Sequence, residues 1–174
     1  MWAWSARAAA DAHGDVASIA AEAATHREPI SPIPPPPALP PAQVALGKRL
    51  FFDRGLSADG SIACHDCHDL NHGGADGKPL PTGIHGTVGT SNTPTVFNSA
   101  GNVRQFWDGH ADTLEDQVDG PLLNASEMGS MWSAVVGKLA RDPSYVTAFG
   151  KEGISPTTIR EAIDLGINWI DTAA

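Results

Sequence analysis

The two cysteines of the chain lie together, in the run Cys64-His65-Asp66-Cys67-His68. Two thiols at this spacing can add across both vinyl groups of one porphyrin, while the histidine that follows turns its imidazole onto the iron. A flat group of that size, held covalently, requires the chain to wrap around it. The run therefore predicts a c-type haem protein with His68 as an iron ligand.

Two other interpretations of the run remain open on local grounds. A redox dithiol of the thioredoxin kind needs a βαβ unit around the motif, and no such pattern flanks Cys64. A zinc ion on Cys64 and Cys67 would draw further ligands from histidines such as His72 or His85. Zinc sites, however, usually pair C-x-x-C with a second pair much further along the chain. The local motif favours haem over both.

Length and charge limit the classes of partner. The 174 residues are enough for one domain with a proper core. The formal net charge is -9, with 11 basic residues against 20 acidic ones. Without a basic cluster to neutralise phosphates, nucleic acid and anionic membranes are not expected as partners, and a basic redox protein suits the charge better. No segment is apolar for long enough to predict a membrane span.

The first forty residues differ in composition from the rest. Residues 1–27 are alanine-rich with a thin apolar face, which predicts a poorly ordered leader. Residues 28–41 contain eight prolines, which predicts an extended arm. Acidic residues interrupt the stretch where a signal peptide would be apolar, so none is visible. Covalent haem attachment in bacteria takes place outside the cytoplasm, and we therefore still expect a periplasmic protein.

The remaining sequence predicts short helices separated by long loops. Helical periods and capping residues place helices at about residues 41–52, 114–118, 130–141, 145–149 and 157–165, with a further turn or two at the haem run. Residues 69–92 are rich in glycine and have no helical period, which is typical of a functional loop. The fold class expected is mostly α, a cytochrome c-like haem domain over residues 42–162 with an atypical tail at 163–174.

Several motifs around the haem run resemble those of the bacterial di-haem cytochrome c peroxidases, a family that also includes the enzyme that matures tryptophan tryptophylquinone. They are residues 46–53, Leu56-Ser57, the C-x-x-C-H run, residues 92–96, 105–109 and 120–129. The resemblance covers roughly residues 28–160 and keeps the order of the motifs. It implies the N-terminal, peroxide-reacting haem domain of an enzyme that reduces hydrogen peroxide with electrons from a small cytochrome c or a cupredoxin.

The resemblance also implies the iron ligands. Cys64 and Cys67 would hold the haem by thioether bonds, and His68 would be the proximal ligand. His85 is similar to the histidine that binds the distal side of the iron in the oxidised resting enzyme and leaves on activation. A departing ligand needs a backbone that can move, and glycines flank this one. Without the resemblance, His85 would be an exposed loop histidine.

Three catalytic roles and one structural role follow from the same resemblance. Glu127 matches the residue that moves a proton between the peroxide oxygens, with Gln117 as its hydrogen-bonding neighbour. In an apolar pocket the pKa of Glu127 would be raised. Trp107 matches the tryptophan proposed to pass electrons between the two haems of the family, and we expect it to be buried. Asn92 matches a residue beside the family's calcium site, so calcium is a second expected cofactor.

The family members carry a second haem domain with its own C-x-x-C-H run, and this chain has no further cysteine. Because peroxide reduction takes two electrons, we expect the chain to be the single-haem half of a longer enzyme, whose complete relatives form homodimers. Residues 165–173 resemble an early strand of the aldo-keto reductases, which we attribute to a fusion, a frame slip or a chance match, with a hydrophobic packing strand as the structural alternative. Two rival functions stay open: a one-haem electron carrier that keeps His85 on the iron, and an inactive or zinc-binding fragment.

Overall fold

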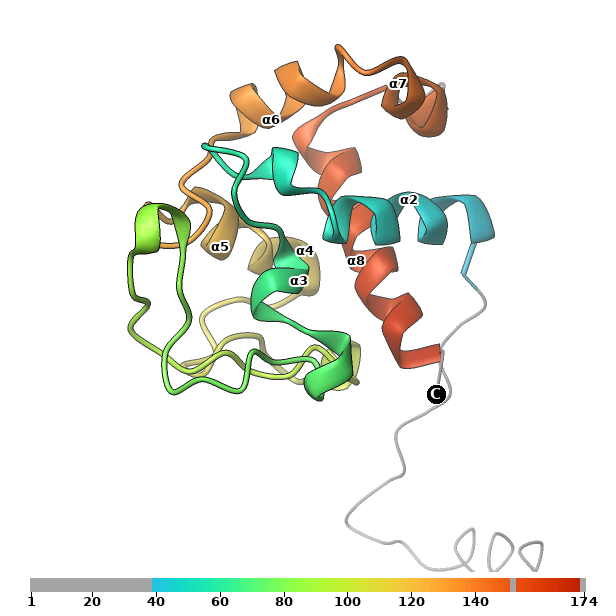
Figure 1. Cartoon of the computed structure of the whole chain (residues 1–174). Helices are drawn as coiled ribbons and strands as arrows, with labels where there is room; N and C mark the ends of the chain where they lie inside the picture. The colour runs from blue at the N-terminus through green and yellow to red at the C-terminus, as the bar shows by residue number, and fades with distance from the viewer. Residues whose placement is uncertain (1–38, 151–152, 173–174) are drawn as a thin grey trace, which may run out of the picture. The chain divides into compact units, whose positions relative to one another are not determined.

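The computed structural model describes residues 39–150 and 153–172, and of residues 165–172 only the backbone. The predicted leader and most of the arm therefore lie outside the described residues. Within the described part the predicted mostly α class, with short helices and long loops, is confirmed (Figure 1). No strand forms there; strand-like pairing is limited to two isolated bridges, Thr82 with Val88 and Gln105 with Ala111.

The helices follow one another along the chain with short 3-10 turns between them. They are α2 Pro41–Phe51, α3 Cys64–Cys67, α4 Leu114–Gln117, α5 Asp119–Leu123, α6 Trp132–Leu139, α7 Pro143–Phe149 and α8 Pro156–Thr172, with the 3-10 turns η1 Arg54–Leu56, η2 Leu70–His72, η3 Ile84–Gly86 and η4 Ser99–Gly101.

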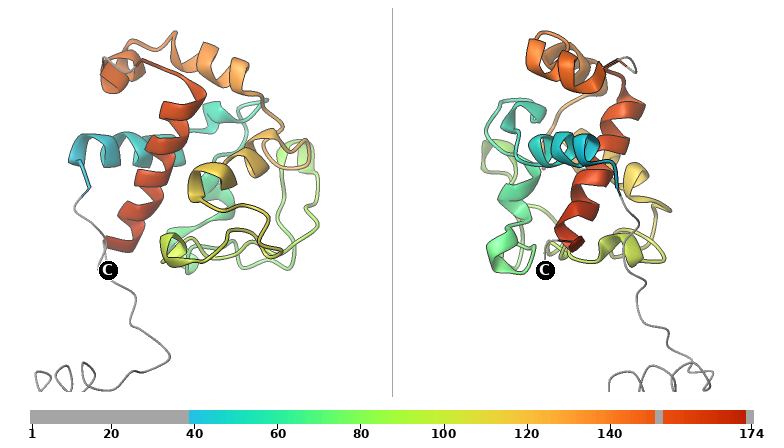
Figure 2. Two further views of the ribbon diagram at one scale, coloured as in Figure 1. Left: turned by 180° about the vertical axis from the view of Figure 1, so that it is seen from behind. Right: turned by 90° about the vertical axis from the view of Figure 1, so that its right-hand side faces the viewer.

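Helix α2 crosses α8, and the two pack against each other at the core (Figures 1 and 2). Leu46 and Leu50 of α2 are buried one turn apart, and Ile159 and Ile163 of α8 repeat the same spacing. Residues four apart lie on one face of a helix, so each helix presents an apolar stripe to the other. Burying one such side chain contributes about 1.5–3 kcal/mol.

Local capping sets where the short helices begin, and α7 begins at Pro143, two residues before the predicted start at Tyr145. The Thr113 hydroxyl accepts a hydrogen bond from the backbone N–H of Asp116 at 3.1 Å, which starts α4. The Asp142 carboxylate accepts from the N–H of Ser144 at 2.8 Å, with Pro143 in the first turn of α7. Such caps satisfy backbone donors that a helix N-terminus leaves without partners.

The strand predicted for the tail is wrong. Helix α8 runs from Pro156 to Thr172 and crosses residue 162, where we expected the haem domain to end. Ile159, Ala162 and Ile163 are buried at helical spacing, so packing against α2 favours continuation of the helix. A strand would need a partner for its backbone hydrogen bonds, and the described part of the chain offers none.

A polar cluster joins three helices behind the core. Arg160 of α8 donates from Nε and Nη2 to the two carboxylate oxygens of Asp119 in α5, at 2.8 and 2.9 Å. The indole Nε1 of Trp132 in α6 donates to the same carboxylate at 2.9 Å, and the guanidinium lies 4.5 Å from the Trp132 ring. This two-pronged geometry is the strong form of an ion pair. It holds α5 directly before the turn that carries Glu127.

Candidate functional site

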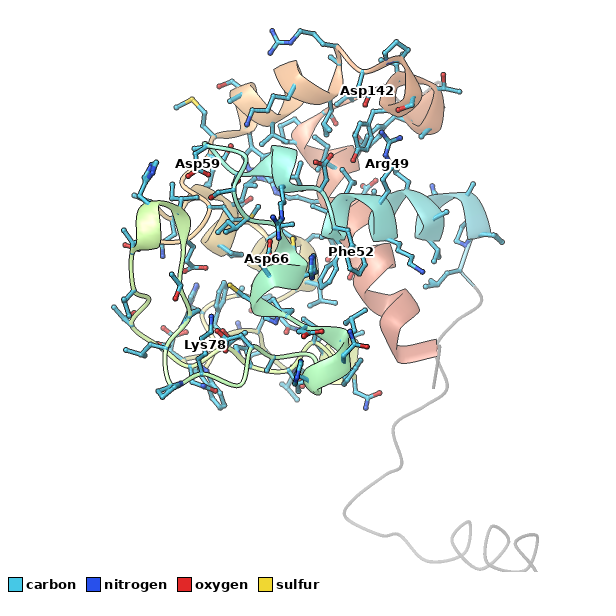
Figure 3. The ribbon with its side chains drawn as sticks, viewed as in Figure 1. Arg49, Phe52, Asp59, Asp66, Lys78 and Asp142 are labelled. Carbon is cyan, nitrogen blue, oxygen red and sulfur yellow. The ribbon has the colours of Figure 1, made fainter. Side chains whose placement is uncertain are left out.

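Helix α3 presents the C-x-x-C-H run as one short turn. The Asp66 carboxylate accepts from the backbone N–H of Ala63 at 2.7 Å and from Nη2 of Arg54 at 2.6 Å (Figure 3). A carboxylate near a helix N-terminus is favourable because backbone N–H groups and the helix dipole point toward it. The two cysteines therefore lie on a turn whose start is held by Asp66.

His68 follows this turn, and one of its ring nitrogens is occupied. Nδ1 lies 3.2 Å from the carbonyl oxygen of Gly74 and 3.1 Å from that of Pro94. A carbonyl can only accept, so Nδ1 carries the proton and Nε2 keeps its lone pair. Burial lowers the pKa of His68, which keeps the imidazole neutral. A neutral histidine whose second nitrogen donates to a carbonyl is the usual form of a metal ligand.

The two thiols are suited to covalent attachment rather than to thiolate chemistry. Both are free and partly buried. Burial raises the pKa of Cys64 to about 12 and that of Cys67 to about 11, so both stay protonated at neutral pH. Zinc binding and dithiol exchange use the thiolate. Among the described residues, moreover, no group of three His, Cys, Asp or Glu could hold a metal ion. The donor set fits a covalent haem with His68 as its ligand.

Glu127 lies in a tight turn after α5. Its side chain is half-buried, and its Oε1 accepts from Nδ2 of Asn124 at 2.7 Å. Burial raises the pKa of Glu127, and the Asn124 hydrogen bond offsets part of that rise. Burial is the largest cause of the raised pKa of Cys67, and nearby carboxylates, including that of Glu127, raise it further. Glu127 is therefore within electrostatic range of the haem run.

The hydrogen-bonding neighbour of Glu127 is one that the sequence analysis missed. Among the described residues no hydrogen bond joins Gln117 to Glu127; the donor is Asn124. Asn124 also accepts at Oδ1 from the backbone N–H of Ser126, at 2.9 Å. An asparagine that bonds the backbone two residues later is a turn signal readable from sequence. Gln117 is half-buried at the end of α4. Its hydrogen bond to Glu127 stays a prediction for the haem-bound protein.

The turn that carries His85 packs directly on the turn that carries Glu127. The N–H of Ile84 donates to the Glu127 carbonyl at 2.8 Å, and the Thr87 hydroxyl donates to the Ser126 carbonyl at 2.8 Å. At Gly83 the approach is so close that an added Cβ would lie 2.0 Å from the Ser126 carbonyl oxygen. The structure thus brings together two residues that the sequence analysis selected separately, His85 and Glu127.

Trp107 is exposed, so the expectation of a buried tryptophan is wrong for the described chain. Its side chain is 70% exposed, and Nε1 donates to the Asn92 carbonyl at 2.7 Å. The residue of this loop that turns inward is Gln105, whose amide donates to the Ser99 carbonyl. Asn92 in turn donates from Nδ2 to the Lys78 carbonyl at 2.6 Å. Trp107 and Asn92 lie together, at a surface rather than in the core.

The comparisons with known proteins show the family. Residues 41–165 match the model of the family described as di-haem cytochrome c peroxidase. The chain belongs to this family. It is 48% identical over 143 residues to the cytochrome c peroxidase Ccp of Escherichia coli (strain K12), covering 79% of this chain and 31% of that protein. It is 45% identical over 109 residues to a cytochrome c551 peroxidase of Pseudomonas aeruginosa, covering 63% and 32%.

Solved structures show the same fold. A MauG-like protein associated with microbial copper homeostasis aligns with a TM-score of 0.70 and 29% identity, over 82% of this chain and 46% of that one. The diheme peroxidase BthA from Burkholderia thailandensis aligns with a TM-score of 0.66 and 27% identity, over 75% and 39%. The family predicted from the motifs is confirmed. The chain spans about a third of the length of the curated relatives it matches. No helix in the described part could cross a membrane.

Proposed function

We propose that the chain carries one covalent haem on Cys64 and Cys67 and is the peroxide-reacting domain of a periplasmic peroxidase. The overall reaction takes up two electrons and two protons for each hydrogen peroxide and yields two water molecules. A small cytochrome c or a cupredoxin would supply the electrons. When bound, the haem iron would supply the site at which peroxide binds and is reduced.

The chain's own residues would hold the haem and manage the proton. His68 would offer Nε2 to the iron, because Nδ1 is committed to the carbonyl oxygens of Gly74 and Pro94. Glu127 would accept the proton of the inner peroxide oxygen and return it to the outer one. A general base works best when its pKa lies near the working pH, and burial moves the pKa of Glu127 in that direction.

One observation carries the proposal: a half-buried carboxylate with a raised pKa lies within electrostatic range of Cys67, and the backbone carbonyl of the same residue accepts from Ile84 of the His85 turn. A pure electron carrier has no use for an acid–base group at the sixth position of its iron. In this proposal His85 would bind the haem iron in the resting state and would leave it to make room for peroxide. Trp107, at the surface, would meet the electron-supplying partner, and Asn92 would lie beside a bound calcium ion.

The test is to produce the chain with export and haem-maturation machinery and to record absorption spectra with and without peroxide, in the oxidised and the reduced state. We expect a covalent haem spectrum that changes on adding peroxide. A Cys64→Ser, Cys67→Ser double variant controls for covalent attachment. Absence of covalent haem would overturn the proposal, whereas a haem spectrum that never responds to peroxide would favour the electron carrier.

A further inference from the structure

We infer that Asp59 is a positioning residue for His85. Its carboxylate accepts a hydrogen bond from Nδ1–H of the imidazole, and Nε2 is thereby presented to the haem iron. The inference rests on the proposed function, in which His85 is the distal ligand. It assigns a partner to a histidine that the motifs alone place in an unsupported glycine-rich loop.

The geometry that points to Asp59 is that its two carboxylate oxygens have different partners. Oδ1 accepts from the backbone N–H of Ser61 at 2.9 Å and from the Ser61 hydroxyl at 2.7 Å. Oδ2 lies 3.5 Å from Nδ1 of His85. Ser61 thus fixes the carboxylate, and the second oxygen faces the imidazole.

The backbone holds the two partners in one frame. His85 adopts a left-handed conformation with φ of 56°, which a non-glycine residue keeps only when its surroundings require it. Those surroundings are the bonds from Ile84 and Thr87 to the Glu127 turn. The N–H of Ala58, next to Asp59, donates to the Met128 carbonyl at 2.9 Å. Asp59 and His85 are therefore both anchored to the turn around Glu127 (Figure 3, Asp59 labelled).

The chemical consequence concerns the tautomer. A carboxylate can only accept, so contact with Asp59 favours the proton on Nδ1 and leaves the lone pair on Nε2. A charged acceptor also makes the imidazole a stronger ligand, and removing such a partner typically lowers metal affinity by about 10-fold to 100-fold. His68 and His85 would then differ in a useful way. His68, the permanent ligand, contacts neutral backbone carbonyls through Nδ1. His85, the exchangeable ligand, contacts a charged side chain through Nδ1.

The experiment compares the haem-loaded wild-type chain with Asp59→Asn. The asparagine oxygen can still accept from Ser61, which turns the amide NH₂ toward His85, where it cannot accept a proton. We expect a smaller six-coordinate, low-spin fraction in the ferric spectrum. Cyanide should bind faster, by about 10-fold to 100-fold, because His85 leaves more readily. Ser61→Ala, which loosens Asp59 without removing it, should shift both readouts less and in the same direction.

The chain contains a matched control. Asp108 contacts Nδ1 of His110 through Oδ1 at 2.6 Å, also at the surface. Asp108→Asn makes the same change of charge and should leave the haem spectrum and the cyanide rate unchanged. An equal effect of both variants would mean that surface charge, not positioning, is responsible, and would overturn the inference.

A fourth variant, His85→Ala, separates failure of the positioning role from failure of the proposed function. If it opens the iron while Asp59→Asn leaves the spectrum as in the wild type, the positioning role is overturned and the proposed function stands. If Asp59→Asn increases the six-coordinate fraction, Asp59 holds His85 away from the iron, which also overturns the inference. If His85→Ala itself changes nothing, His85 is not a ligand, and the ligand assignment in the proposed function fails together with the inference.

Discussion

Nδ1 of His68 lies 3.1 Å from the carbonyl oxygen of Pro94, a residue 26 positions further along the chain. Together with the Gly74 carbonyl at 3.2 Å, this contact determines which nitrogen of the proposed proximal ligand is free for iron. The geometry around Gly74 and Pro94 is thus part of the site, because the imidazole would be released only if both carbonyls shifted.

Gly74→Ala should disturb this arrangement and destabilise the fold. Gly74 has φ of +73°, and an added Cβ would lie 2.9 Å from the Thr95 hydroxyl oxygen and 3.0 Å from the backbone nitrogen of Val96. Backbone strain and overpacking together should lower the free energy of unfolding by about 2–5 kcal/mol, measured by denaturant unfolding. Gly77→Ala is the control, since its φ is +65° but nothing lies within 4 Å; its loss should be about 1–2 kcal/mol. Equal losses would argue against close packing at Gly74.

Glu127→Gln should slow peroxide turnover by about 10²-fold to 10⁴-fold, since the amide can keep a hydrogen bond with Asn124 but cannot shuttle a proton. The haem spectrum should stay nearly the same. Steady-state turnover and absorption spectra of the loaded protein check both statements. Glu161→Gln, at an exposed position of α8, should change neither. Loss of the haem itself in Glu127→Gln would show that the residue is structural.

Tyr145 should make stability depend on pH in the alkaline range. Its hydroxyl donates to the Asp53 carboxylate, and the Arg49 guanidinium lies 3.6 Å from the ring centroid. Burial, and then the bond to Asp53, raise the pKa of Tyr145. The unfolded phenol ionises near pH 10, so the folded chain retains a proton that the unfolded chain loses above that pH. The stability that Tyr145 contributes is therefore complete below about pH 10 and falls as pH rises toward the folded pKa.

The measurement for Tyr145 is direct because the chain has a single tyrosine. In the folded protein, phenolate absorbance should appear only at pH values well above 10, the ordinary pKa of tyrosine. Tyr145→Phe should lower the free energy of unfolding at pH 7 by about 1–3 kcal/mol, the contribution of a hydrogen bond to a charged group. It should also show a shallower alkaline decline than the wild type. A phenol that ionises at its ordinary pKa in the folded chain would contradict the buried bond to Asp53.

Trp107→Ala should change the stability of this chain by less than about 0.5 kcal/mol, as is usual for exposed positions. Its side chain is 70% exposed, whereas that of Phe51 is 1% exposed. Phe51→Ala, which leaves a cavity in the core, should lower the free energy of unfolding by about 3–5 kcal/mol. Denaturant unfolding of both variants tests the contrast. A loss of several kcal/mol in Trp107→Ala would mean that the tryptophan is packed in solution.

Features encoded within a few neighbouring residues were predictable. The start of α4 depends on Thr113, whose hydroxyl bonds the backbone three residues later. The start of α7 was predicted two residues late, although the Asp142 cap that sets it is equally local. The family was recognisable because its motifs are short and keep their order. The tail was mispredicted because its resemblance to a reductase strand is local, whereas the choice between strand and helix depends on the packing partner. That partner is α2, more than a hundred residues earlier.

By itself, the sequence determined the chemistry available: two thiols and a histidine at haem spacing, a candidate acid–base carboxylate and a glycine-flanked histidine. Only the tertiary structure decided how these groups are paired. It placed Nδ1 of His68 on the Pro94 carbonyl, Asp59 against His85, and Trp107 at the surface. The physical reason is that a hydrogen bond's partner and a side chain's burial depend on segments distant in sequence that folding brings together, whereas a residue's chemical type does not.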